Sequence, residues 1–173
     1  MERCEIKRAA FHSLISSLHK ARIYYIDECG IDTYVCREYA HAKRGKKVAG
    51  NISGKRFKRT NIVAAKCGAD IVAPMIYDGT TDSTLFEDWF EYHFLPVVPE
   101  GSYCILDNAT FHRKSRLHAL AENVGCRVIF LPPYSPDLNP IENFWAWLKR
   151  QLKKILPHCE GFMDALCGLF KVK

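Results

Sequence analysis

The chain has 173 residues, enough for one domain or for one domain and a fragment. Hydrophobic residues make up 48% and aromatic residues 12%, which is enough for a sizeable core, and the formal net charge is +6. No run of 18 or more apolar residues occurs, which excludes a membrane-spanning helix, and the first ten residues lack the apolar centre of a secretory signal. We therefore expect a cytoplasmic protein with no membrane partner.

The positive charge is concentrated in one segment. Outside it, the chain has 17 basic and 19 acidic residues, so the positive field is local. A basic segment is typical of a solvated face as well as of a nucleic-acid contact. Its members are Lys43, Arg44, Lys46, Lys47, Lys55, Arg56, Lys58 and Arg59, and a smaller cluster holds Lys149, Arg150, Lys153 and Lys154.

The eight cysteines are scattered, and no pair has the C-x-x-C spacing of a zinc or redox site. Several lie in apolar runs such as "YCILD" and "CRVIFL". We therefore expect free thiols, most of them buried, in a reducing compartment.

The first third of the chain predicts a helix followed by strands. Residues 5–20 have Ile6, Ala10, Leu14 and Leu18 at helical spacing, which favours an amphipathic helix. β-Branched and aromatic residues then favour strands over residues 22–28 and 32–40, joined by a tight turn at 29–32. Two further strands are predicted at 58–67 and 70–79, linked by a hairpin turn at Gly68.

The rest of the chain alternates helices and strands. Asp82 is expected to cap a helix over 82–95 with one broad apolar face formed by Leu85, Phe86, Trp89, Phe90 and Phe94. The elements that follow are a strand at 102–108, a helix at 113–125 closed by Gly125, a strand at 126–131, a helix at 140–156 with Pro140 in its first turn, and a short helix at 161–170. A meander followed by crossovers predicts an α/β fold with a mixed sheet and helices packed on it.

Three acidic residues occupy positions that propensity alone would not choose. Asp27 closes an apolar strand, Asp107 ends "YCILDN", and Glu142 lies in the first turn of a helix. Carboxylates at strand ends lie at the edge of the core, where α/β sheets bind ligands, and several together repel one another unless a cation joins them. Taken singly, Asp107 could begin an Asx-turn and Glu142 could favour the helix dipole.

These residues resemble a known family. "YIDECG", "ILDNATFH" and "LPPYSPDLNPIENFWAWLK" are similar to the three acidic motifs of DDE transposases of the mariner-like superfamily, within it the bacterial insertion sequences of the IS-six-thirty group. The 34 residues between Asp107 and Glu142 match the spacing of that group. The resemblance implies a ribonuclease H-like fold with a five-stranded mixed sheet flanked by helices.

The resemblance also implies chemistry. Asp27, Asp107 and Glu142 would be the catalytic residues and would hold two Mg²⁺ or Mn²⁺ ions that promote DNA phosphodiester cleavage and strand transfer at the ends of an insertion sequence. Hard oxygen ligands without Cys–His spacing select these ions over zinc.

Other residues have supporting roles in this reading. Glu28 should point to the opposite face of its strand from Asp27. Asn108 and His112 could orient the aspartate, touch DNA, or act only as turn and cap. The basic segment is expected on the active-site side, and Lys149, Arg150 and Lys153 follow Glu142 on its helix, where they could contact phosphates.

The resemblance sets expectations for organisation and partners as well. Residues 1–21 would be the remnant of a linker to a helix-turn-helix module, and residues 22–173 the catalytic domain. The expected partners are DNA, a second copy in the DNA complex, and possibly a separate helix-turn-helix polypeptide, with action at the bacterial nucleoid. The alternatives are an inactive remnant that only binds DNA and a non-mobile ribonuclease H-like nuclease.

Overall fold

The computed structural model describes residues 4–18, 22–32 and 59–171, and the centre of this part is a five-stranded sheet in the order β3-β2-β1-β4-β5. The strands are β1 (Ile23–Asp32), β2 (Arg59–Cys67), β3 (Asp70–Asp78), β4 (Tyr103–Leu106) and β5 (Arg127–Phe130). The first three pair antiparallel, whereas β4 pairs parallel to both β1 and β5. The predicted mixed five-stranded sheet is confirmed.

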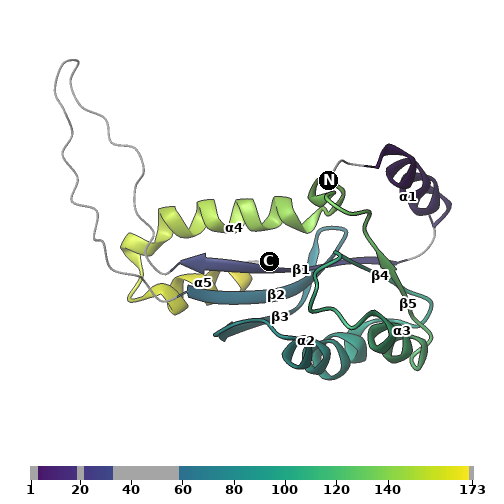
Figure 1. Ribbon diagram of the computed structural model, residues 1–173. Coiled ribbons are helices and arrows are strands. Elements are labelled where there is room, and N and C mark those ends of the chain that lie inside the picture. The colour runs from purple at the N-terminus through teal and green to yellow at the C-terminus, as the bar shows by residue number, and fades with distance from the viewer. Residues whose placement is uncertain (1–3, 19–21, 33–58, 172–173) are drawn as a thin grey trace, which may run out of the picture.

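Helices cover both faces of the sheet. They are α1 (Glu5–Ser17), α2 (Ser83–Trp89), α3 (Lys114–Glu122), α4 (Ile141–Ile155) and α5 (Phe162–Lys171). In Figure 1, α1 and α4 lie on one side of the sheet, and α2 and α3 lie on the other. Short turns of 3₁₀- or π-helix extend α2 over Phe90–Phe94 and Leu95–Val97, precede α4 at Pro136–Leu138, and follow it at Leu156–His158.

Alternate side chains of β1 point to opposite faces of the sheet and so belong to two separate hydrophobic layers. Tyr24 and Ile26 of β1 face the aromatic residues of α2 and the apolar residues of α3. Cys29 and Ile31, at odd positions of the same strand, face α4 and α5. The aromatic face predicted for 82–95 is confirmed, because Phe86, Trp89, Phe90 and Phe94 are almost fully buried.

The predicted turn at residues 29–32 is wrong. β1 runs without interruption to Asp32, because β2 pairs with it as far as Asp32 opposite Arg59. Gly30, which suggested the turn, instead leaves room for the Arg59 side chain, which a Cβ at that position would overlap. Of the strand predicted at 32–40, only Asp32 lies among the described residues.

The buried face predicted for the first helix is also wrong. Ile6 is 82% exposed and Leu14 is 42% exposed, whereas Phe11 is buried and Ile15 packs beside it. The helix touches the molecule through one narrow stripe at the β4–β5 end of the sheet, so most of its apolar residues face solvent. Helical periodicity alone did not indicate which stripe would be buried.

The turns predicted at Gly68 and Gly125 and the cap predicted at Asp82 are confirmed. Gly68 has a φ of +58° in the β2–β3 turn, and Gly125 has a φ of +69° after α3. The Asp82 carboxylate accepts a hydrogen bond of 2.9 Å from a backbone N–H in the first turn of α2. Pro140, which was predicted in the first turn of α4, lies instead at the N-cap, one position earlier.

The cysteines of the described residues are free. Cys29, Cys104 and Cys126 are buried and Cys4 is exposed, while the others are partly buried. No helix among residues 4–18, 22–32 and 59–171 combines the length and the apolarity needed to cross a bilayer.

Candidate active site

The parallel pairing of β1 with β4 brings two of the predicted acids together. Ile23 pairs with Tyr103 and Tyr25 with Ile105, so continuing this register by two residues places Asp27 level with Asp107. Asp107 directly follows the last residue of β4. The two carboxylates therefore lie next to each other at the C-terminal end of β4, although they are 80 positions apart in the sequence.

The loop of residues 131–140 presents the third acid. Four prolines limit its backbone freedom, which lowers the entropy cost of holding one conformation. The backbone N–H of Glu142 donates to the Asn139 carbonyl at 3.1 Å, and the Asn139 side-chain amide donates to the Ile26 carbonyl at 3.4 Å. The start of α4 is thus tied to the residue that precedes Asp27.

Asp27, Asp107 and Glu142 line one pocket of about 380 Å³. The pocket lies between the end of β4, the 131–140 loop and the first turn of α4. Its remaining lining residues are Asn108, Ala109, Leu131, Pro132, Pro133, Tyr134, Ser135, Pro136 and Asn139.

The pKa values of Asp27 and Asp107 are shifted in opposite directions. Burial, together with the charges of Glu142 and Asp107, raises the pKa of Asp27 to about 7, although the Trp145 indole N–H donates to its Oδ2 at 3.1 Å. Burial also acts to raise the pKa of Asp107, but hydrogen bonds from His112 Nε2 at 3.2 Å and from the Ala109 N–H at 2.9 Å outweigh it. The net pKa of Asp107 therefore lies below its usual value.

The shared pocket does not amount to a preformed ion cage. Within the described ranges, no three acidic, histidine or cysteine side chains are arranged so that they could enclose a metal ion as they stand. The protein itself occupies oxygens of both aspartates, through Trp145 on Asp27 and through His112 and a backbone N–H on Asp107. Joint coordination would need side-chain rotation.

Glu28 lies on the other face of β1, as the alternation of the strand predicts. It pairs opposite Val63, which belongs to the core beneath α2 and α3. Its Oε1 is buried and has no hydrogen-bond partner. Burial and the charges of Asp27 and Asp107 raise the pKa of Glu28 to about 8, so the carboxyl is largely protonated at neutral pH.

Asn108 and His112 make different contacts around Asp107. The Asn108 amide donates to the Leu131 carbonyl, and its Oδ1 accepts from Lys114, so Asn108 ties the loop after β4 to the 131–140 loop. His112 is buried, contacts Asp107, and has an Nδ1 without a partner. The Asx-turn considered for Asp107 is present as well, without withdrawing the carboxylate from the pocket.

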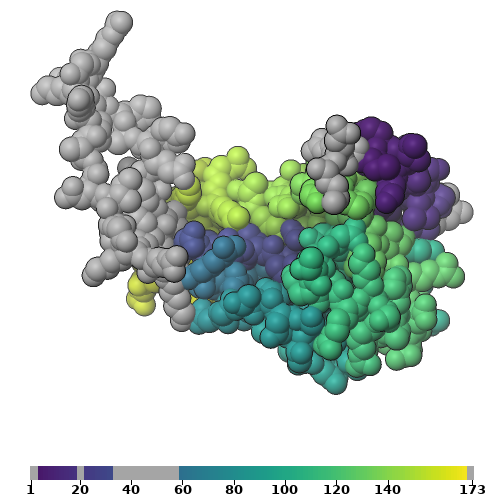
Figure 2. All heavy atoms as spheres, in the orientation of Figure 1, coloured from purple at the N-terminus to yellow at the C-terminus, as the bar shows by residue number. Residues whose placement is uncertain are grey.

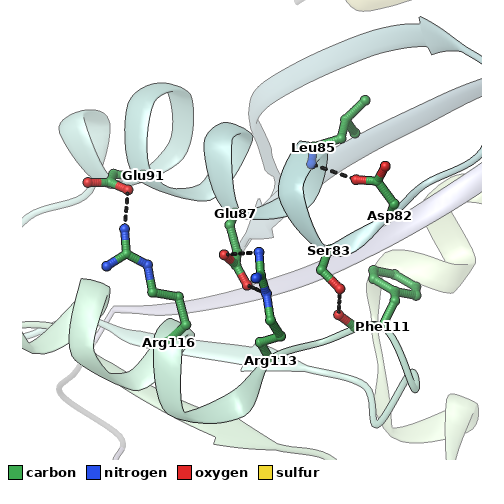
Figure 3. A network of polar contacts seen from close by, with 8 residues as sticks. All are labelled: Asp82, Ser83, Leu85, Glu87, Glu91, Phe111, Arg113 and Arg116. Atoms are coloured by element: carbon green, nitrogen blue, oxygen red, sulfur yellow. Dashed lines mark hydrogen bonds and ion pairs between the residues drawn. The ribbon is translucent and has the colours of Figure 1, made fainter.

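A polar network holds the segment after Asp107 against α2 (Figure 3). Glu87, buried on α2, accepts two hydrogen bonds of 2.6 and 2.7 Å from Arg113. Ser83 donates to the Phe111 carbonyl at 2.5 Å, and Arg116 donates to Glu91 at 3.1 Å. The contacts of Ser83 and Glu87 hold Phe111 and Arg113, the two residues that flank His112, and so help to orient His112 toward Asp107.

The predicted basic residues divide into three groups. Those at positions 43–58 lie outside the described residues. Arg59 lies over Gly30, which shares the face of Glu28, so its guanidinium is on the side of the sheet opposite Asp27 rather than on the pocket side. Lys149, Arg150 and Lys153 are exposed on α4.

Lys149 contacts β1 near Asp27. Burial raises the pKa of the Cys29 thiol, and the charge and hydrogen bond of Lys149 oppose that rise. Cys29 is two residues beyond Asp27 on the same face of β1, so the Lys149 amine lies against the strand beside the pocket.

Sequence reasoning missed two residues that shape the pocket. Trp145 is buried and also donates to Asp27, a role that the sequence analysis does not assign to it. Its position three residues after Glu142, on the same helical face, was the available signal. Asn139 is buried and bridges to β1, and no feature of the sequence distinguished it from an ordinary turn residue.

Comparison with known proteins gives a consistent picture. The model of the family described as DDE superfamily endonuclease matches residues 22–160. The protein y4pE/y4sA of Sinorhizobium fredii (strain NBRC 101917 / NGR234) is 37% identical over 73 residues, which cover 36% of this chain and 52% of that protein. The match thus spans about half of that relative.

Two solved structures show the same fold. The Mos1 strand transfer complex superposes with a TM-score of 0.68 at 17% identity, covering 99% of this chain and 60% of that one. The catalytic domain of Mos1 mariner transposase gives a TM-score of 0.56 at 14% identity, covering 97% of this chain and 87% of that one. These likenesses confirm the fold class expected from the three acidic motifs.

Proposed function

The chain belongs to the family of DDE superfamily endonucleases, and from this premise we propose that it is the catalytic part of a transposase that cleaves DNA phosphodiesters and joins strands at insertion-sequence ends. One observation carries the proposal: Asp27, Asp107 and Glu142, from three separate elements, line the same pocket. In this reading they are the catalytic residues.

The donor set fits divalent cations. Three carboxylates share the pocket, and the pKa of Asp27 is raised by burial and by the charges of the other two acids, which is the repulsion that a cation would relieve. We propose that these acids hold two Mg²⁺ or Mn²⁺ ions, and two solved Mos1 paired-end complexes are described as containing Mn and Mg. Bound there, such ions supply Lewis acidity to the phosphodiester and make an attacking water or 3′-hydroxyl more acidic.

The chain's own side chains prepare the site. The Trp145 N–H and the His112 Nε2 each hold an aspartate oxygen in the metal-free protein, which gives Asp27 and Asp107 a defined orientation from which they would rotate to hold a cation. No serine or tyrosine nucleophile is required, because the attacking group is a water or a DNA 3′-hydroxyl. Asn108 and His112 thus act in support of Asp107.

DNA is the proposed substrate and partner. Lys149, Arg150 and Lys153 follow Glu142 along α4, and we expect them to contact phosphates that flank the scissile one without reading sequence. One structural relative is a Mos1 transposase paired-end complex with a transposon end, and by likeness we propose that a second copy joins the DNA complex here.

The test is Glu142→Gln, which keeps side-chain size and removes the charge. Nicked generic DNA at low salt with Mg²⁺ or Mn²⁺ should be cleaved and joined by the parent and not by the variant. Melting curves in chelator should show equal or slightly higher stability, because the acidic cluster loses one repulsion. The exposed Glu122 of α3 provides the control variant Glu122→Gln, which should cut like the parent.

The outcomes separate the candidates. A Glu142→Gln protein that cuts as well as the parent removes Glu142 from the site and ends the proposal. Cleavage without any joined product would identify a hydrolytic nuclease rather than a transposase. DNA binding without cleavage by the parent in either metal would leave only a DNA-binding protein.

A further inference from the structure

The first helix holds the loop that leads to Glu142. The Arg8 guanidinium donates two hydrogen bonds to Asp137, one of 3.1 Å to Oδ1 and one of 2.6 Å to Oδ2. This fork is the geometry in which arginine binds a carboxylate most specifically. The Arg8 side chain is only 13% exposed, although that of Asp137 is 46% exposed, so most of the Arg8 side chain lies against the protein.

Apolar contacts reinforce the same junction. Phe11 of α1 is buried in a cluster with Ile105 of β4 and Leu131, the first residue of the 131–140 loop. Ile15 of α1 and Leu138, near the end of that loop, pack against this cluster. Helix α1 therefore contacts the 131–140 loop near both ends of that loop. Figure 2 shows the atoms of α1 packed against the segment that precedes α4.

The 131–140 loop connects Asp137 to the residues that position Asp27 and Glu142. Asp137 lies in the short 3₁₀ turn Pro136–Leu138, and the next residue, Asn139, donates to the Ile26 carbonyl and accepts from the Glu142 N–H. A shift of Asp137 would therefore move the first turn of α4 relative to β1. A misplacement of about 1 Å can lower a rate about 100-fold when the chemistry depends on positioning.

We infer that Arg8 is a positioning residue: through Asp137 it fixes the 131–140 loop and thereby sets the place of Glu142 relative to Asp27. The helix that carries Arg8 lies before residue 22, where the match to the endonuclease family model begins. The working unit therefore includes α1, which is more than a linker. The effect on activity rests on the proposed function, whereas the effect on loop order does not.

The experiment compares Arg8→Met and Arg8→Lys with the parent. Arg8→Met keeps the apolar part of the side chain and removes both hydrogen bonds to Asp137. Arg8→Lys keeps a positive charge, and its amine can donate one hydrogen bond to Asp137. Arg8 also lies 4.0 Å from Glu5, so Glu5→Gln removes that weaker pair and leaves Asp137 engaged. Arg116→Met removes an arginine–carboxylate pair between other helices and controls for general loss of an ion pair.

Two readouts are needed. Hydrogen exchange by mass spectrometry should show amides of residues 131–140 exchanging about tenfold faster in Arg8→Met, less so in Arg8→Lys, and unchanged in Glu5→Gln and Arg116→Met. Metal-dependent cleavage of nicked DNA should lose about tenfold or more in kcat, with a smaller change in KM, because the displaced loop misplaces Glu142.

Each outcome decides the inference. Unchanged loop exchange in Arg8→Met overturns it, whatever the activity. Faster exchange spread evenly over the whole molecule, with no recovery in Arg8→Lys, shows only a stability role and also overturns it. If the parent itself does not cleave DNA, the proposed function fails, and faster exchange confined to residues 131–140 still supports the restraint by α1.

Discussion

Replacing Asp27 by asparagine should stabilise the metal-free protein, and more at pH 8 than at pH 5. Burial and the charges of Glu142 and Asp107 raise the pKa of Asp27 from 3.8 to about 7. Between these values the folded protein holds a proton that the unfolded chain has lost, so the free energy of unfolding falls as the pH rises. Asparagine has no proton to lose, and the variant escapes this decline.

The magnitude follows from the two pKa values. Relative to Asp27→Asn, the parent should lose about 2–3 kcal/mol of unfolding free energy between pH 5 and pH 8. Glu28 contributes in the same direction, because the charge of Asp27 is among the causes that raise its pKa to about 8. The double variant Asp27→Asn, Glu28→Gln should therefore have a still flatter pH dependence.

The assay is urea denaturation in chelator at several pH values from 5 to 8. The control is Asp88→Asn, which alters an exposed acid on α2 far from the pocket and should track the parent at every pH. A constant difference between the parent and Asp27→Asn over this range would refute the reasoning, since it would mean that the Asp27 carboxyl titrates alike in the folded and unfolded states.

Three further changes test other contacts. Trp145→Phe removes the N–H that lowers the pKa of Asp27, so it should destabilise the protein by about 2–3 kcal/mol, with the larger loss at pH 8, in denaturant titrations at two pH values. Glu87→Gln weakens the paired hydrogen bonds with Arg113 and should cost about 1–2 kcal/mol by chemical denaturation; an unchanged midpoint would mean that solvent replaces them. Asp82→Ala removes the cap of α2 and should cost about 1 kcal/mol, measured as a lower melting temperature that Asp82→Asn largely restores.

Local patterns in the sequence predicted the parts of the fold that depend on near neighbours. Asp82 identified the start of α2, and Gly125 identified the turn that follows α3. Both features depend only on residues within a few positions, as helix caps and left-handed turns do. The end of β1 was not predictable in this way. It continues past Gly30 because β2, which follows a long intervening segment, supplies hydrogen bonds as far as Arg59.

The same distinction applies to the site. The sequence predicted that Asp27, Asp107 and Glu142 would share a site, and the structure places them in one pocket. Asp27, however, lies in the middle of β1 rather than at the strand end where the sequence placed it, because β1 continues to Asp32. The contacts of Trp145 with Asp27 and of Arg8 with Asp137 depend on how the helices lie against the sheet. The spacing of Trp145 from Glu142 indicated only a shared helical face, and no pattern in the sequence linked Arg8 to Asp137.

The parallel pairing of β1 with β4 also sets the order in which the site can form. Ile23 pairs with Tyr103, so closing this contact joins residues 80 positions apart, whereas the β2–β3 hairpin closes within a short turn. During synthesis, the hairpin can form early, but the pocket must await α4. Until then the face of β1 and β2 that carries Ile31 and Ile62 remains uncovered, so a ribosome that pauses before α4 would hold an aggregation-prone chain without an active site.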